Sequence, residues 1–305
     1  MDGFIVIDKP VDMTSHTVVS RLRRILGEKK AGHTGTLDPF ATGVLPVALG
    51  EATKALQFLD ESEKEYDAVM RLGSATDSYD LTGSVTKEGK WQDITFAMLQ
   101  DVIKKFEGKQ SQIPPMFSAL KRHGVPLYKL ARKGETVQRE PREIFIGSIS
   151  VYEFNPPYVR FSLNCSRGTY VRTIANDIGE LLGSYAHLTE LRRVRSGPFS
   201  ILRSITLEKL EETCGSEEMN SYIIPVLEAL APLPKLNLLS SSVQNVKNGK
   251  FPVVKDMDET SEQMISGKNY CLTFDNRLIA VAKFVTTDTE GKGRSGEFRL
   301  LRVFN

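Results

Sequence analysis

Hydrophobic positions in the first fifty residues follow two different patterns. Residues 4–8 form a short apolar run that predicts a strand, and Pro10 ends it. Apolar residues then recur at helical spacing between a hydroxyl residue at position 14 or 15 and Gly27, which predicts a capped amphipathic helix. The stretch 31–50 is rich in glycine and proline and has no helical period, so we expect a structured loop that leads into a buried strand over 44–49.

Strand and helix patterns alternate through the middle of the chain. Residues 158–165 alternate between apolar and polar, which is typical of a half-buried strand, and apolar positions recur at helical spacing from there to Gly183. Some connections resemble hairpins, so a mixed α/β sheet is favoured over a purely parallel one. The same patterns predict a helix over 51–59, a strand over 66–73, a polar turn over 76–83 and a helix over 95–106.

Residues 108–142 depart from this pattern. They contain four prolines and eight cations, with Phe117 and Tyr128 between them. We interpret the segment as an excursion from the core with one short helix near 127–132. A second change follows the run 230–235, which looks like a domain boundary. The pattern beyond it is all-β, with strands on both sides of an Asp275-Asn276 turn over 269–285, a last strand over 298–304 and an exposed loop over 286–296.

The composition limits the possible classes of protein but does not identify a function. The 305 residues suggest about two domains. The formal net charge of +2 neither requires nor excludes a nucleic-acid partner. The sequence has no apolar run of the roughly 18 residues that a membrane helix needs, and its first residues do not resemble a signal peptide, so we expect no membrane association. Three scattered cysteines indicate reduced thiols in the cytoplasm, and Cys165 is expected in the core.

Asp38 is the main candidate for chemistry. It lies in the glycine-rich motif GHTGTLDP over 32–39, and loops held by a rigid scaffold often carry catalytic groups. The alternative is that Asp38 only caps a turn. Asp77 and Asp80 fit either a magnesium site or, more commonly, a solvated turn. The sequence lacks the signatures of P-loop, HExxH and GxSxG enzymes.

Six sequence blocks follow one another in order and cover most of residues 1–230. They are FIVIDKPVDMTS near the N-terminus, GHTGTLDPFATGVLPV over 32–47, KEYDAVMRLG around Tyr66, QIPPMFSALK over 112–121, RGTYVRTIANDIGE over 167–180 and HLTELRRVRSGPF over 187–199. Together these blocks resemble the TruB family of tRNA pseudouridine synthases. The block with Asp38 resembles the catalytic motif of the family.

The resemblance implies a fold and an activity. Residues 1–233 are expected to adopt the pseudouridine synthase fold, an α/β (α+β) arrangement with a central mixed, largely antiparallel sheet flanked by helices. Residues 108–142 would clamp RNA and be mobile without it, and residues 234–305 resemble a small PUA-like RNA-binding barrel. The implied protein is a cytoplasmic monomer that needs no cofactor, metal or protein partner. The family usually has glycine where this chain has Asp12, so the turn there is expected to differ.

The implied reaction converts the T-loop uridine (position 55) of tRNA to pseudouridine. It breaks the N1–C1′ bond, turns the uracil and forms a C5–C1′ bond, after the base has left its stack. The resemblance makes Asp38 the catalytic carboxylate, either as a nucleophile or as the base that removes a sugar proton. Arg172 would pair with Asp38, Tyr170 would lie near the sugar, and Tyr66 would stack on the uracil and help to remove the C5 proton.

Five further residues match family positions that handle the substrate. His33 would contact RNA and fill the space left by the extruded base, and Leu191 would line the uracil pocket. Lys9 and Pro10 would support the active-site wall, and Lys54 would lie on the side that faces RNA.

Two other classes of function stay open from the sequence. A catalytically idle RNA-binding or RNA-chaperone module would use the same basic segment, and assistance in tRNA folding is also compatible with isomerase activity. A glycosidase or nuclease would cleave the RNA or release free base, whereas an isomerase leaves its mass unchanged.

Overall fold

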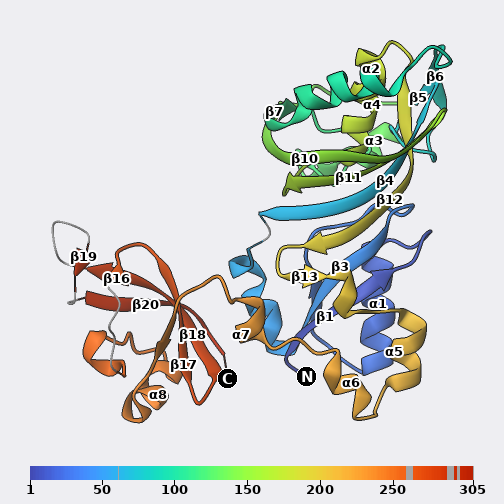
Figure 1. The fold of residues 1–305 in the computed structure, drawn as a ribbon. Helices are drawn as coiled ribbons and strands as arrows, with labels where there is room; N and C mark the ends of the chain where they lie inside the picture. The colour runs from blue at the N-terminus through green and yellow to red at the C-terminus, as the bar shows by residue number, and fades with distance from the viewer. Residues whose placement is uncertain (61, 259–263, 287–291, 294–295, 305) are drawn as a thin grey trace.

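The computed structural model describes residues 1–304 except 61, 259–263, 287–291 and 294–295, and most of them belong to one body around a large sheet (Figure 1). Ten strands form this sheet: β1 (Gly3–Lys9), β2 (Ala31–His33), β3 (Thr42–Leu49), β4 (Glu63–Leu72), β7 (Gly108–Gln112), β10 (Arg142–Asn155), β11 (Tyr158–Ser166), β12 (Ala186–Ser196), β13 (Phe199–Ser200) and β14 (Ser204–Ile205). Their order is β14-β1-β3-β12-β4-β11-β10-β7, with β2 and β13 added at β3 and β12. Only β1–β14 and β3–β12 pair in parallel, so the sheet is mixed and largely antiparallel, as the sequence predicts.

Helices cover the two halves of the sheet separately. Helix α1 (Ser15–Leu26) begins at Thr14, whose side chain accepts a hydrogen bond from Thr17, and ends at Gly27 in the left-handed region, as predicted. It packs with α5 (Leu207–Thr213) on the half that contains β1 and β3. Helices α2 (Phe96–Ile103) and α4 (Val171–Leu181) pack on the other half, against β4, β10, β11 and β12.

Short elements connect these layers. They are the 3-10 helices η1 (Gly50–Phe58), η2 (Lys104–Phe106) and η3 (Ile201–Arg203), the helices α3 (Leu127–Ala131), α6 (Glu218–Ser221) and α7 (Val226–Ala229), and the two-stranded pairs β5 (Ser74–Thr76) with β6 (Val85–Glu88) and β8 (Lys121–Arg122) with β9 (Val125–Pro126). The predicted helix over 51–59 is thus a 3-10 helix. The short helix expected near 127–132 is α3.

A separate β sheet has the strand order β15-β17-β18-β20. Its strands are β15 (Lys235–Asn237), β17 (Asn269–Phe274), β18 (Arg277–Thr286) and β20 (Gly296–Val303), while β16 (Met264–Ile265) pairs with β19 (Lys292–Gly293). Asp275 and Asn276 join β17 to β18 with φ angles of 48° and 57°, which confirms the predicted turn. The all-β prediction is wrong, because this part also contains the helix α8 (Ser240–Lys247) and the 3-10 helix η4 (Val254–Asp256). The predicted loop over 286–296 lies mostly outside the described residues.

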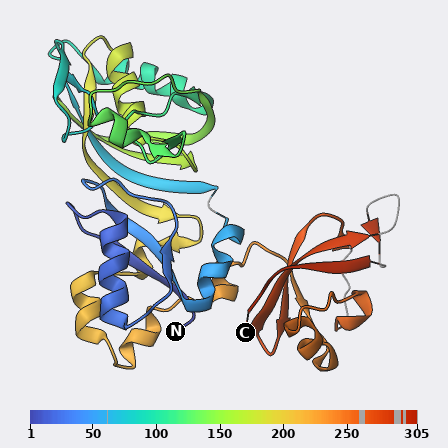
Figure 2. The ribbon, with the colours of Figure 1, turned by 180° about the vertical axis from the view of Figure 1, so that it is seen from behind.

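The C-terminal sheet shares a hydrophobic core with the large body. Val281 and Phe304 belong to the same buried cluster as Phe4, Ala52 and Ala55. Figures 1 and 2 show this contact near α7 and η1, with the C-terminal sheet projecting to one side. No helix in the described part of the chain is both long and apolar enough to span a bilayer.

The segment 108–142 is only in part an excursion. Its first five residues are β7, the edge strand of the main sheet, which pairs with β10. The residues after it form the β8–β9 pair and α3, which Figure 2 shows in front of the sheet. The sequence patterns did not predict β10 or β12, although both lie within the sheet.

Candidate active site

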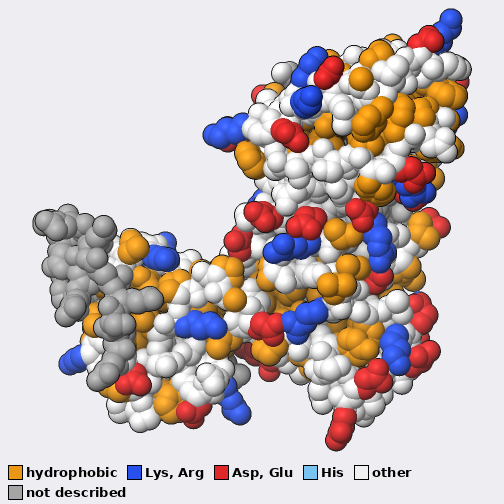
Figure 3. All heavy atoms as spheres, in the orientation of Figure 1, with side chains coloured by type: hydrophobic (Ala, Val, Ile, Leu, Met, Phe, Trp, Pro, Cys, Tyr) orange, Lys and Arg blue, Asp and Glu red, His pale blue; other side chains and the backbone are white. Residues whose placement is uncertain are grey.

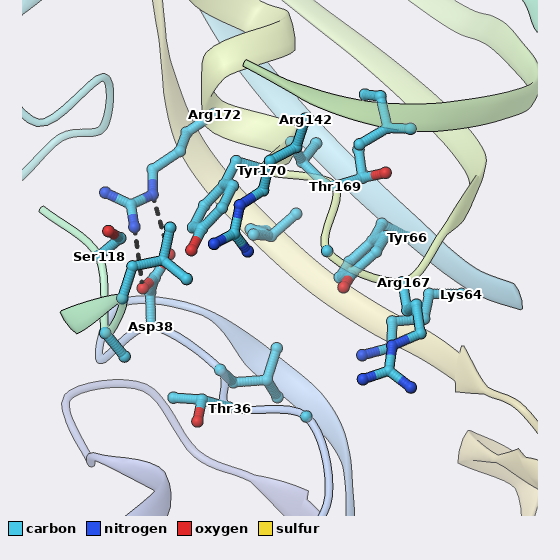
Figure 4. Close-up of a pocket in the computed structure, with 18 of the residues that line it drawn as sticks. Thr36, Asp38, Lys64, Tyr66, Ser118, Arg142, Arg167, Thr169, Tyr170 and Arg172 are labelled. Carbon is cyan, nitrogen blue, oxygen red and sulfur yellow. Dashed lines mark hydrogen bonds and ion pairs between the residues drawn. The ribbon is translucent and has the colours of Figure 1, made fainter. Parts of the chain in front are cut away.

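A pocket of about 580 Å³ opens where β4, β12, the N-terminus of α4 and the segment after β7 meet. Four of its lining residues are the predicted catalytic residues Asp38, Tyr66, Tyr170 and Arg172 (Figure 4). Leu191 also lines it. The structure therefore brings together side chains that the chain spaces more than 130 positions apart.

The loop that carries Asp38 is held on both sides of that residue. The Ser15 hydroxyl accepts a hydrogen bond from the Leu37 N–H at 2.9 Å and donates to the Leu37 carbonyl at 3.2 Å. The Lys9 ammonium donates to the Pro39 carbonyl at 3.1 Å. Asp38 itself is thereby fixed on the wall of the pocket, and its side chain stays 34% exposed.

Arg172 holds the Asp38 carboxylate with two atoms. Its Nε lies 3.0 Å from Oδ2, and its Nη2 donates to Oδ1 at 3.1 Å. The guanidinium also donates to the carbonyls of Ser78 at 3.1 Å and Phe117 at 2.6 Å. The Arg172 side chain is only 3% exposed, so these bonds fix the orientation of the fork and, through it, that of the carboxylate.

Asp80 is a second carboxylate on the same guanidinium. Its Oδ2 lies 3.6 Å from Nη1 of Arg172, and its side chain is 5% exposed. The hydroxyls of Ser78 and Thr82 donate to its other oxygen. The interpretation of Asp80 as a solvated turn residue is wrong, because Leu188 of β12 bridges to it and α4 supplies its cation. The sequence singled out Asp80 only as part of the DSYD motif and did not indicate that it is buried beside Arg172.

The charges around Asp38 act in opposite directions on its pKa. Burial raises the pKa of this carboxyl, and the nearby Asp80 also raises it. Arg172 and Lys9 lower it. The position of Arg172 therefore favours the ionised form of an otherwise disfavoured carboxylate.

Two tyrosines face the pocket with their rings. Tyr66 is a buried residue of β4, and burial raises its pKa to about 12. Tyr170 precedes α4, where the Gln112 side chain bonds both its N–H and its carbonyl, and the Arg172 guanidinium lies 5.8 Å from its ring centroid. Figure 4 shows Tyr170 between Asp38 and Tyr66. Both hydroxyls are protonated at neutral pH, because burial raises both pKa values.

The other predicted site residues lie outside the pocket lining. Lys9 is fully buried behind the Asp38 loop, bonded to the carbonyls of Pro10, Met13 and Pro39, and burial lowers its pKa to about 8. His33 ends β2. Lys54 pairs with Glu51 and donates to the Val303 carbonyl of the C-terminal sheet.

Asp12 has the left-handed conformation that its position demands. Its φ is 64°, and its N–H donates to the Pro39 carbonyl at 2.9 Å. The turn thus keeps a backbone suited to glycine even though the residue is aspartate. The turn at Asp12 therefore differs from the family pattern in residue type, and it still bonds to the loop that carries Asp38.

The mouth of the pocket carries basic side chains. Arg142, Arg167 and Lys64 line it together with Thr169 and Thr36 (Figure 4). The view of the molecule in Figure 3, in contrast, shows acidic and basic side chains interspersed, with no continuous basic surface. The described residues contain no group of three or more His, Cys, Asp and Glu that could hold a metal. Cations beside a carboxylate and two aromatic rings suit a ligand that has phosphates and a flat base.

Comparison with known families identifies the family of proteins to which a chain with this pocket belongs. Residues 23–171 match the model of the N-terminal domain of TruB family pseudouridylate synthase, and residues 172–231 match that of the C-terminal domain of tRNA pseudouridylate synthase B. The chain belongs to the TruB family of pseudouridine synthases. It is therefore an isomerase.

Relatives of this TruB-family chain match it over its whole length. The tRNA pseudouridine synthase B of Geobacter sulfurreducens is 51% identical over 100% of both chains, and that of Geotalea uraniireducens is 51% identical over 100% of this chain and 98% of its own. Among solved structures, a chain of a Cbf5-Nop10-Gar1 complex is similar to this chain with a TM-score of 0.77 and 33% sequence identity. The alignment covers 99% of this chain and 85% of that one. These similarities also confirm the predicted pseudouridine synthase fold.

Proposed function

We propose that this chain converts the T-loop uridine at position 55 of tRNA to pseudouridine, with Asp38 as the catalytic carboxylate. The observation that carries the proposal is the two-atom contact between Asp38 and the buried Arg172 on the wall of a pocket lined by Tyr66 and Tyr170. The relatives named tRNA pseudouridine synthase B support tRNA as the substrate.

The proposed reaction starts with an everted uridine in the pocket. The ionised Asp38 acts at the ribose, either by bonding to C1′ as the N1–C1′ bond breaks or by removing a sugar proton, and both routes leave uracil free to turn. Carbon C5 then bonds to C1′, as the bond between Asp38 and C1′ breaks in the first route or as the removed proton returns to the sugar in the second. C5 finally loses its proton to solvent, and N1 takes up a proton. Tyr66 stacks on the uracil during this rotation, Leu191 packs at its edge, and Tyr170 lies beside the sugar. The isomerisation transfers no electrons and uses no cofactor.

The remaining assignments concern the RNA partner. We propose that residues 108–142 clamp the T stem and loop, that His33 contacts the RNA, and that Lys54 faces it. Lys9 and Pro10 support the wall behind Asp38. We assign residues 1–233 to the catalytic domain and 234–305 to a PUA-like RNA-binding domain. The proposed enzyme acts in the cytoplasm as a monomer, without a protein partner.

The alternative is an RNA-binding or RNA-chaperone module without turnover. It is weaker, because such a module does not require a carboxylate locked by a buried arginine in a pocket. Help in tRNA folding is compatible with the isomerase and adds to it. A glycosidase or nuclease would leave abasic or broken RNA.

Release of tritium from a T-arm RNA labelled at uracil C5 tests the proposal. The native chain should release the label, while Asp38→Asn, which keeps the shape and loses the charge, should release none and still bind the RNA. RNA mass should stay unchanged apart from the exchanged isotope. Equal release by both proteins would exclude Asp38 as the catalytic group. RNA binding by the native chain with no release would favour the idle module.

A further inference from the structure

Arg193 is a buried cation that the proposed reaction does not yet use. It lies on β12, and no part of it is exposed. Its Nε donates to the Val44 carbonyl at 2.8 Å, and its Nη2 donates to the Gly35 carbonyl at 2.8 Å. Within the described part of the chain, no carboxylate lies within ion-pair distance of it. Burial of a guanidinium without a carboxylate is costly, so these main-chain contacts must compensate for it.

The two carbonyls belong to the two ends of one loop. Gly35 precedes Asp38 by three positions, and Val44 follows it within β3. A single guanidinium therefore closes the segment 35–44 that presents the catalytic carboxylate. The approach is close, since a Cβ at Gly35 would lie 3.1 Å from Nη1 of Arg193.

The same side chain also reaches Tyr66. Arg193 is directly opposite Tyr66 in the register of β12 and β4, and both are buried on the side of the sheet that faces the pocket. The guanidinium interacts with the Tyr66 hydroxyl, and this contact and its charge lower the tyrosine pKa, against the larger effect of burial. Arg193 thus contacts the base-stacking residue and the catalytic loop at once.

We propose that Arg193 is a positioning residue that ties Tyr66 to the loop carrying Asp38, so that the stacked uracil and the reacting ribose keep a fixed spacing while the base turns. The inference rests on the proposed roles of Asp38 and Tyr66. A base that is detached from its sugar is held only by the pocket walls. A change in the distance between these walls therefore acts on the rotation step more than on RNA binding.

The substitution Arg193→Lys tests the tie. Lysine keeps the charge but has no planar fork, so it cannot bond both carbonyls and the hydroxyl together. We expect the single-turnover rate of tritium release to fall by about tenfold or more, while the affinity for T-arm RNA changes by less than about threefold. The matched control is Arg192→Lys on the same strand, because Arg192 points to the opposite face and holds Asp8 with contacts of 3.0 and 2.7 Å. The control should keep the native rate within about twofold.

A double-mutant cycle with Tyr66→Phe separates the tie from general stability. Phenylalanine keeps the ring and loses the hydroxyl, so Arg193→Lys should cost a smaller factor in that background than in the native chain. Equal factors in both backgrounds, or equal losses of rate and affinity, would overturn the inference. If Arg193→Lys does not fold, Gly35→Ala applies the same test. Its methyl group would lie 3.1 Å from Nη1 of Arg193 and 2.7 Å from the movable end of Lys64, and it removes no buried charge. Its rate loss must then show the same dependence on the Tyr66 hydroxyl.

The outcomes also distinguish this inference from the proposed function. If the native chain releases no tritium, the proposed function fails. If the native chain is active, Asp38→Asn is inactive and Arg193→Lys behaves like Arg192→Lys, only the positioning role of Arg193 fails.

Discussion

At the residue scale, one positive charge serves two carboxylates. Arg172 contacts Asp38 through two atoms and lies 3.6 Å from Asp80, and all three groups are wholly or partly removed from water. The trio carries a net negative charge when both acids are ionised. This arrangement makes the protonation of Asp38 sensitive to each of its neighbours.

The pH dependence of turnover should report these neighbours with opposite signs. In the proposed reaction Asp38 must be ionised, so the rate should fall as the pH drops through its raised pKa. Arg172→Met removes a charge that lowers this pKa, so the acidic limb should move to higher pH. Asp80→Asn removes a charge that raises it, so the limb should move to lower pH even if the rate falls. Single-turnover rates across acidic and neutral pH measure both shifts.

The control for this pair is Asp77→Asn, which alters the same turn outside the ion-pair network. The Asp77 side chain accepts a hydrogen bond from the Ser84 N–H at 2.9 Å. The acidic limb of the pH–rate profile of Asp77→Asn should coincide with that of the native protein. Shifts of Arg172→Met and Asp80→Asn in the same direction would contradict the electrostatic account.

Sequence could predict Asp38 but not Asp80 at this scale. Asp38 lies in a motif whose glycines, proline and flanking apolar residues are recognisable in one dimension. The burial of Asp80 depends on Leu188 and Arg172, which are more than ninety positions away, so the local polar pattern suggests a solvated turn. The sequence did not predict the burial of Arg193 either, because a charged residue in a strand pattern does not indicate full burial.

At the element scale, β3 and β12 meet at a glycine that has no room for a side chain. Gly43 has a φ of 97°, and a Cβ there would lie 2.2 Å from the Arg193 carbonyl oxygen. The two strands pair in parallel at this point. The close approach of the two strands therefore depends on the absence of a side chain at Gly43, and it fixes β12 against the strand that follows the Asp38 loop.

Gly43→Ala should destabilise the fold much more than a glycine replacement in open space. We expect it to lower the free energy of unfolding by about 3 kcal/mol or more, because strands must separate and the φ is unfavourable. Gly27→Ala, at a helix end with a φ of 63° and no atom near the new methyl group, should cost only about 1 kcal/mol. Urea unfolding of both variants measures the difference. Similar costs would mean that the strands adjust easily.

Periodicity predicted the elements with a clear apolar face and missed the others. The strands β1, β3, β4 and β11 and the helices α1 and α4 follow their sequence patterns closely. The strand β12 has the sequence AHLTELRRVRS, whose arginines hide its buried face, and β10 has a bulged register that disturbs its alternation. Helix α8 is short and weakly amphipathic, so nothing local distinguishes it among strands.

At the scale of the whole molecule, the segment after β7 extends from the pocket to the exposed tip of the proposed RNA clamp. Its base is anchored, because the Phe117 carbonyl accepts from Arg172 and Gln112 pairs with the backbone of Tyr170. Its tip, over 121–139, is mostly exposed, and the backbone hydrogen bonds of its loops and turns are local, with partners within 118–131. The anchored base and the exposed tip should therefore differ in their dynamics.

Hydrogen exchange should separate the two parts. Without RNA, amides over 121–139 should exchange quickly, while those of β7, paired with β10, should exchange slowly. Bound T-arm RNA should slow exchange over 121–139, and Asp38→Asn prevents turnover during the measurement. Slow exchange over the tip without RNA would contradict the prediction that this clamp orders on binding.

The order of strands in the large sheet has a consequence for synthesis. β1 emerges first from the ribosome but pairs with its parallel neighbour β14 only about two hundred residues later, and Asp38 meets Arg172 after 134 residues. A nascent chain that stops before residue 170 has the Asp38 carboxylate without Tyr170 and Arg172. The proposed enzyme therefore cannot act on RNA until more than half of its own translation is finished.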